Sequence, residues 1–169
     1  MDNATDKPVT CGKGCYRKAV MVSALVVTVY TFLFDWLTQG KLFASYYIET
    51  ASLWRAPEQM QANLPFCILF HLVVAYLITK GFFAWRKRVP VGAVGSCDCP
   101  YRKAMGYGMW AGMLLGACWA ATYIYLPIPG KLAVMWFFSA IVKWTLGGLL
   151  LGKLYACDKL NAWKEKTGV

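Results

Sequence analysis

The sequence predicts an all-α polytopic membrane protein with four transmembrane helices arranged as two helical hairpins. Of its 169 residues, 59% are hydrophobic and only 15% are charged, whereas soluble domains carry about 25% charged residues. The apolar residues gather in four blocks, each near the roughly 20 residues that a helix needs to cross a bilayer. A water-soluble bundle is the alternative, but it would have to hide four apolar helices in a chain too small to bury them.

The four blocks follow one another along the chain. They comprise residues 19–37, 62–79, 104–130 and 132–152. The third block has no charged residue, and it ends in a proline- and glycine-containing turn, LPIPG, that leads to the fourth. Such a turn predicts a tight hairpin between the last two helices.

The first two blocks are separated by a longer segment, residues 38–61. It carries Tyr46, Tyr47 and Trp54 among polar residues, which predicts an interfacial helix with aromatic anchors at headgroup depth. We expect Pro57 to end or kink this helix. The segment would serve either as a membrane-surface anchor or as a docking surface for a partner.

The charge distribution predicts the orientation of the chain. Most of the 18 Lys and Arg residues precede the first block, separate the second from the third, or follow the fourth. Positive loops mark the cytoplasmic face, so both termini should be cytoplasmic. The net charge of +10 then fits anionic lipid headgroups and not nucleic acid. The first 16 residues are polar and no cleavage pattern follows the first apolar block, so this block should remain in the protein.

A short repeat divides the single transmembrane domain, residues 1–169, into two similar units. The tetrapeptide Tyr-Arg-Lys-Ala occurs at 16–19 and at 101–104, each time after a cysteine pair. The units, residues 11–88 and 97–157, would be parallel hairpins related by an axis along the membrane normal. Chance is the alternative, because basic residues commonly anchor the cytoplasmic start of a helix.

The cysteine pairs are candidates for a metal site on the cytoplasmic face. The four residues are Cys11, Cys15, Cys97 and Cys99. If the hairpins are related by a two-fold axis, four thiolates could bind zinc or an iron–sulfur cluster. Free or lipid-modified thiols are the alternative. Cys67 and Cys118 lie inside apolar blocks, where a cysteine usually acts as a small apolar residue.

Small residues at four-residue spacing predict close helix contacts. Gly108, Gly112 and Gly116 form a strip on the third helix, and Gly148 and Gly152 share this spacing on the fourth. Such strips let helix backbones approach each other in membranes. The two helices would pack on each other, or one strip would seat a second subunit, a flat cofactor or a lipid.

Asp35, His71 and Lys143 are the ionisable residues within the apolar blocks. A charge at the bilayer centre costs at least about 2.5 kcal/mol on insertion scales, so these groups should face the protein interior or a polar cavity. His71 could ligate haem or copper, or simply be hydrogen-bonded. Lys143 could be neutral or reach a partner chain. Three isolated groups do not by themselves define an ion pathway.

The sequence contains none of the common catalytic motifs, such as HExxH, GxSxG or a phosphate-binding glycine loop. The stretches FDWLTQGKL, ETASLWRAPEQM and PIPG resemble those of a family of small uncharacterised bacterial four-helix membrane proteins. This resemblance covers the first helix, the segment after it and the last turn. It implies a bacterial inner-membrane protein and transfers no site residue.

These observations favour a non-enzymatic accessory subunit of a larger inner-membrane complex, in contact with lipids and with other subunits or itself. A small homo-oligomeric transporter or channel for a metal ion or small solute is the first alternative. A cytoplasm-facing thiol or metal sensor is the second. A resident cofactor is not identified by sequence, although bound lipid is expected.

Overall fold

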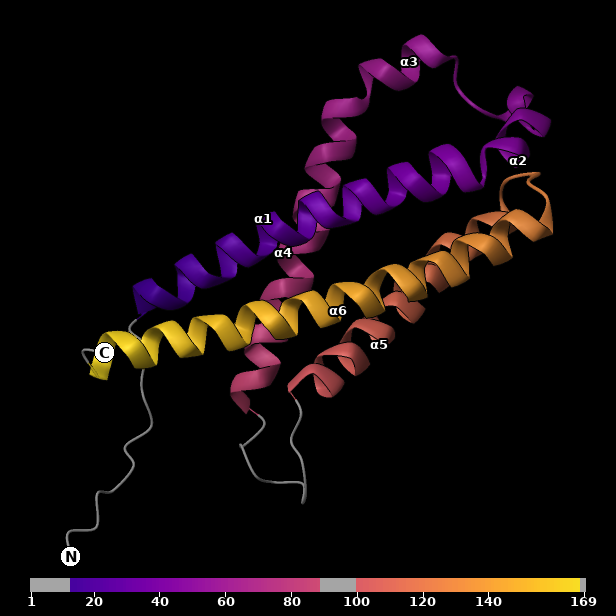
Figure 1. Ribbon diagram of the computed structural model, residues 1–169. Coiled ribbons are helices and arrows are strands. Elements are labelled where there is room, and N and C mark those ends of the chain that lie inside the picture. The colour runs from indigo at the N-terminus through magenta and orange to yellow at the C-terminus, as the bar shows by residue number, and fades with distance from the viewer. Residues whose placement is uncertain (1–12, 89–99, 168–169) are drawn as a thin grey trace, which may run out of the picture.

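The described part of the chain, residues 13–88 and 100–167 of a computed structural model, is helical and contains no strand (Figure 1). In order, the elements are α1 (Lys13–Leu37), the π-helical turn η1 (Thr38–Leu42), α2 (Ala44–Glu49), the 3-10 turn η2 (Ala51–Leu53), α3 (Pro57–Ala62), α4 (Leu64–Arg88), α5 (Pro100–Ala120), the 3-10 turn η3 (Ala121–Ile124) and α6 (Gly130–Thr167). Among these described residues, three segments are long and apolar enough to span a membrane: Tyr16–Leu42, Leu64–Arg86 and Gly130–Ala156. These spans confirm the expected class, a helical multi-pass membrane protein.

The fourth expected span is shorter than predicted. The apolar block 104–130 suggested a helix as far as the LPIPG turn, but α5 ends at Ala120 and is followed by the single turn η3. The prolines at 127 and 129 explain part of the difference, because a proline disfavours helical geometry at the residue before it.

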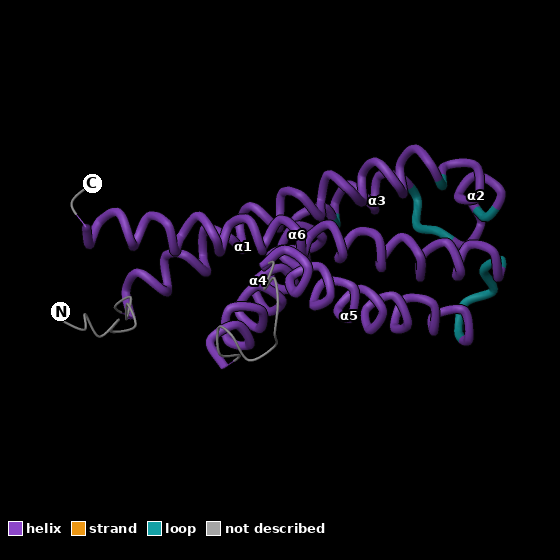
Figure 2. The backbone as a smooth tube through the Cα atoms, turned by 60° about the horizontal axis from the view of Figure 1, so that its bottom comes forward, coloured by secondary structure: helices purple, strands orange, loops and turns teal. Residues whose placement is uncertain are grey.

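The helices do not all run in one direction. Helices α1, α5 and α6 lie roughly along one another, while α4 crosses them steeply (Figures 1 and 2). The most extensive contact joins α5 to α6, and the next joins α1 to α4. The start of α1 and the end of α6 lie at one end of the molecule. We call the opposite end, with connections 38–63 and 121–129, the loop end.

The segment after α1 is not the single interfacial helix that was expected. It is divided into η1, α2, η2 and α3. Pro57 does not end a helix there but is the first residue of α3. A proline is tolerated at that position because the missing N–H would have no partner within the helix.

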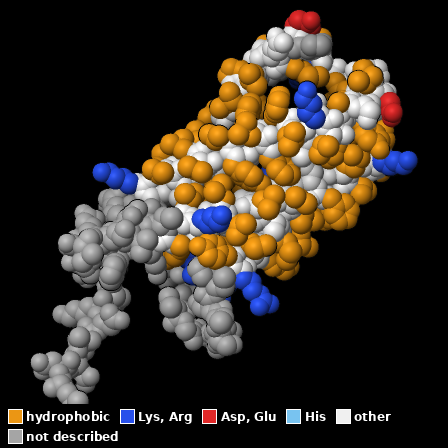
Figure 3. Space-filling view, in the orientation of Figure 1, with side chains coloured by type: hydrophobic (Ala, Val, Ile, Leu, Met, Phe, Trp, Pro, Cys, Tyr) orange, Lys and Arg blue, Asp and Glu red, His pale blue; other side chains and the backbone are white. Residues whose placement is uncertain are grey.

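Few side chains are buried, and large apolar side chains cover the surface. One buried cluster lies where α4 crosses the other helices and includes Val27, Phe82, Trp144 and Leu151. A second, at the loop end, includes Phe43, Leu132 and Trp136. Among the exposed apolar side chains are those of Val29, Leu33, Leu69, Phe70, Trp110, Leu114, Val134 and Val142. They give the molecule the largely hydrophobic surface of Figure 3, which suits contact with lipid.

Candidate functional site

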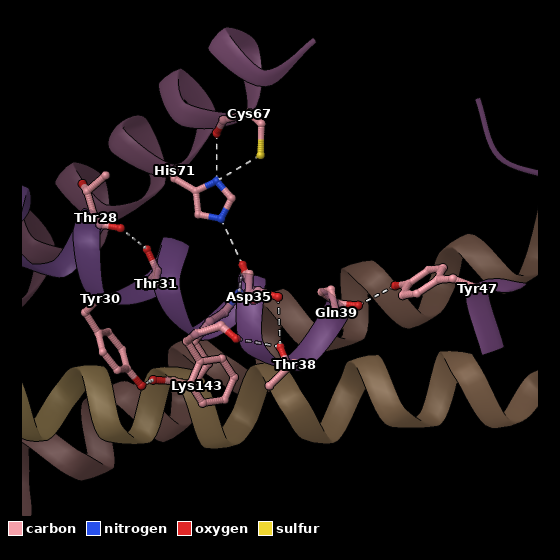
Figure 4. A network of polar contacts seen from close by, with 11 residues as sticks. Thr28, Tyr30, Thr31, Asp35, Thr38, Gln39, Tyr47, Cys67, His71 and Lys143 are labelled. Atoms are coloured by element: carbon pink, nitrogen blue, oxygen red, sulfur yellow. Dashed lines mark hydrogen bonds and ion pairs between the residues drawn. The ribbon is translucent and has the colours of Figure 1, made fainter. Parts of the chain in front are cut away.

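The three ionisable residues of the apolar blocks meet at one point (Figure 4). Asp35 comes from α1, His71 from α4 and Lys143 from α6. The Lys143 ammonium group donates to both carboxylate oxygens of Asp35, with Nζ 2.9 Å from Oδ1 and 2.8 Å from Oδ2. Nε2 of His71 lies 3.0 Å from Oδ2. We call this set the polar triad; each of the three candidate spans contributes one member.

The His71 ring is fixed on both sides by its surroundings. Nδ1 lies 2.8 Å from the carbonyl oxygen of Cys67, one turn earlier on α4, and 3.6 Å from the Cys67 sulfur. The ring of Phe32 approaches it edge-on, with centroids 5.8 Å apart. Because both nitrogens already have partners, a haem or copper ion at His71 would have to displace one of them.

The backbone around Asp35 and Lys143 is also held by side chains. The Tyr30 hydroxyl donates to the backbone carbonyl of Lys143 over 2.9 Å and so joins α1 to α6. The Thr38 hydroxyl donates to the carbonyl of Phe34 at 2.9 Å. The π-helical turn η1 begins at Thr38, and such turns are frequent at functional sites.

The polar triad lies at the edge of the protein and not at its centre. The side chains of His71, Asp35 and Lys143 are 15%, 20% and 14% exposed. The part of α4 that precedes His71, residues 64–70, is exposed at every position. In Figure 1 this part leads away from the other helices toward α3. A partly open ionic site therefore borders a helix segment with few neighbours.

The predicted glycine strips lie where α5 and α6 touch. A Cβ atom added to Gly108 would come within 2.0 Å of the Trp144 carbonyl oxygen, and one on Gly148 within 2.2 Å of the Ala104 carbonyl oxygen. At Gly112 and Gly116 the nearest atoms are also backbone oxygens of α6, at 2.8 and 2.9 Å. Gly152 is buried. The α5 strip therefore faces α6 of the same chain along its length.

The predicted cysteine site falls outside the described residues. Cys11, Cys97 and Cys99 are not described, and nor is the side chain of Cys15. Within the described ranges, no group of three or more His, Cys, Asp or Glu side chains is placed to hold a metal ion. The zinc or iron–sulfur site stays a prediction.

A second polar contact, at the loop end, was not expected from the sequence. The Trp136 indole N–H donates to the Tyr47 hydroxyl over 2.8 Å, and that hydroxyl donates to Gln39. The Trp54 ring lies edge-on to both aromatic rings, at 5.3 Å from Tyr47 and 6.2 Å from Trp136. Sequence identified Tyr47 and Trp54 as interfacial aromatics, but nothing in it pointed to Trp136 as their partner.

No family model, curated protein or solved structure matches this chain. The resemblance noted for FDWLTQGKL and its companion stretches stays a prediction.

Proposed function

We propose that this chain is a non-enzymatic subunit of a bacterial inner-membrane assembly, and that residues 64–70 of α4 meet a transmembrane helix of another subunit. The observation that carries this proposal is the combination of a helix segment that is exposed at every position and a partly exposed polar triad beside it. An apolar helix can lie against lipid without a protein neighbour. Charged groups within the membrane need other protein or water around them.

Lipid tails cannot supply that cover. Ionisable groups within membranes face protein or water-filled space because exposure to hydrocarbon is costly. The polar triad holds one acid and two bases, and the two bases share Asp35 as their common side-chain partner. The partner helix should therefore present a hydrogen-bond acceptor, such as a carboxylate or amide oxygen, at the depth of the triad.

The proposal includes a topology of four spans in two parallel hairpins, with both termini in the cytoplasm. Helix α5 has 21 residues, which at 1.5 Å per residue is about 32 Å and close to the roughly 30 Å of a bilayer core. The start of α1 and the end of α6 lie at the same end of the molecule (Figure 1), as an even number of crossings requires. Helices α1 and α4 form one contact pair, and α5 and α6 the other.

Native mass spectrometry of the chain released from its own membranes in mild detergent tests the proposal. We expect a heteromeric mass that is lost when Leu69 and Phe70 are both replaced by alanine. The matched control is the alanine pair at Val73 and Leu77, which are also exposed and lie on the next turns of α4. A bare monomer under several mild detergents, or equal loss from both pairs, would argue against a partner at residues 64–70.

The polar triad also favours a second candidate function, a small homo-oligomeric transporter for an ion or polar solute. A site built from three spans and partly open at its edge is suited to hold a transported charge. Flux into liposomes should then fall in His71→Ala and Lys143→Ala, and unchanged flux would exclude this function. A thiol or metal sensor would instead lose its bound metal in Cys97→Ser with Cys99→Ser.

A further inference from the structure

The two ring nitrogens of His71 both face oxygen atoms that act as acceptors. Nδ1 lies 2.8 Å from the Cys67 carbonyl oxygen. A peptide carbonyl has no hydrogen to donate, so a hydrogen bond at this distance requires the hydrogen on Nδ1. A neutral imidazole carries only one such hydrogen. Its other nitrogen, Nε2, would then present a lone pair to Oδ2 of Asp35, 3.0 Å away.

Two lone pairs cannot form a hydrogen bond, so the Nε2–Oδ2 contact needs one more proton. That proton is either on Nε2, as imidazolium beside carboxylate, or on Oδ2, as carboxylic acid beside neutral imidazole. Lys143 decides between them, because its ammonium group also donates to Oδ1 and to this same Oδ2. An ammonium group that donates to both carboxylate oxygens favours the ionised carboxylate.

We propose that His71 and Asp35 form a proton-binding site within the membrane-spanning helices, with the bound proton on Nε2 at neutral pH. The described titratable groups that act on His71 are Asp35 from α1, Lys143 from α6 and Cys67 from its own helix. Asp35 favours the bound proton, and the like charge of Lys143 opposes it. The Cys67 thiol lies beside Nδ1, not beside the bound proton.

The proton also has a structural role. It completes a hydrogen bond between α1 and α4 next to residues 64–70, which have no buried position of their own. A ring that loses one proton has a single hydrogen for two acceptors, so it must give up its hydrogen bond either to Asp35 or to the Cys67 carbonyl. The proposal needs no partner subunit, so it stands or falls separately from the function proposed above.

The chain offers a direct test because His71 is its only histidine. Full-length protein labelled with ¹⁵N in histidine, purified through a tag that lacks histidine, gives imidazole resonances from this residue alone. At neutral pH we expect hydrogens on both ring nitrogens. In Asp35→Asn the side-chain amide can donate to Nε2, so the ring should become neutral and keep only the Nδ1 hydrogen.

Two further variants keep the test decisive. Cys67→Ala retains the backbone carbonyl and should leave both ring hydrogens in place. Lys143→Met removes the donor that favours the ionised carboxylate, so the Nε2 hydrogen should be held less firmly than in the wild type, a change that remains measurable if Asp35→Asn does not fold. A wild-type ring with a single hydrogen at neutral pH, or a doubly protonated ring that survives in Asp35→Asn, would overturn the proposal.

Discussion

Two pairs of helices in this molecule are joined in opposite ways. Helices α5 and α6 meet through backbone atoms, with Gly108 against Trp144 and Gly148 against Ala104. Near the loop end, α1 and α4 meet through the side chains of the polar triad, and α4 then leads away. The α5–α6 contact depends on the close fit of two backbones, which cannot accommodate a larger side chain. The α1–α4 contact depends on charged side chains, so a change in protonation or a partner helix can alter it.

The largest effect should come from filling the α5–α6 contact. In Gly108→Ala the new methyl group would lie 2.0 Å from a backbone oxygen, and no side-chain rotation can relieve that overlap. Overpacking of this kind costs about 1–3 kcal/mol, and occasionally more. We expect a lower melting temperature in detergent and poor recovery of folded protein.

Gly106, two residues before Gly108 and facing away from α6, provides the control. A Cβ atom there would meet nothing within 4 Å. Gly106→Ala should therefore raise stability by about 0.5–1 kcal/mol, the usual gain from replacing a helical glycine. Equal destabilisation by both variants would contradict a contact based on shape.

The α5–α6 contact can be anticipated from sequence because it depends on a local pattern. Glycines four residues apart lie on one face of a helix, and LPIPG places the next helix directly beside it. The bend at the loop end could not be anticipated in the same way. Its division into short turns depends on how residues 43–54 pack against α6, which local sequence does not determine.

A smaller effect should follow from removing the shared partner of the polar triad. Asp35→Ala leaves Lys143 and His71 without their carboxylate, and a buried polar group that loses its partner costs about 1–3 kcal/mol. Because the triad is partly exposed, we expect the lower part of this range. The measurement is the melting temperature at neutral pH.

The double variant Asp35→Ala with Lys143→Met distinguishes charge from shape. It removes the uncompensated ammonium group as well, so it should be more stable than Asp35→Ala alone. If the double variant loses as much stability as the sum of its single variants, the α1–α4–α6 junction depends on packing, and its contrast with α5–α6 disappears.

The sequence identified each of the three residues of the polar triad, but it did not show that they lie together. An ionisable residue in an apolar block is conspicuous, because its cost in lipid requires a partner. Residues 35, 71 and 143 are far apart in the chain, and their meeting depends on how α1, α4 and α6 are rotated about their axes. The apolar blocks do not determine these rotations, since apolar residues occupy both exposed and buried positions.

The smallest effect on stability should come from removing the hydrogen bond that joins the loop end to α6. The Tyr47 hydroxyl accepts from Trp136 of α6, so Tyr47→Phe should cost about 1 kcal/mol. Tyr125→Phe, at a fully exposed site, should cost nothing measurable. Burial raises the pKa of Tyr47 above its ordinary value of 10.0, although the Trp136 N–H opposes the shift.

The native state therefore keeps the Tyr47 proton at a pH where the unfolded chain releases it, and stability must fall as pH rises past about 10. Tyr47→Phe should lose this part of the alkaline decline, whereas Tyr125→Phe should keep it. If the wild type and Tyr47→Phe decline alike, the hydroxyl is not held by α6. The segment after α1 would then be held to α6 only by the apolar packing around Phe43 and Trp136.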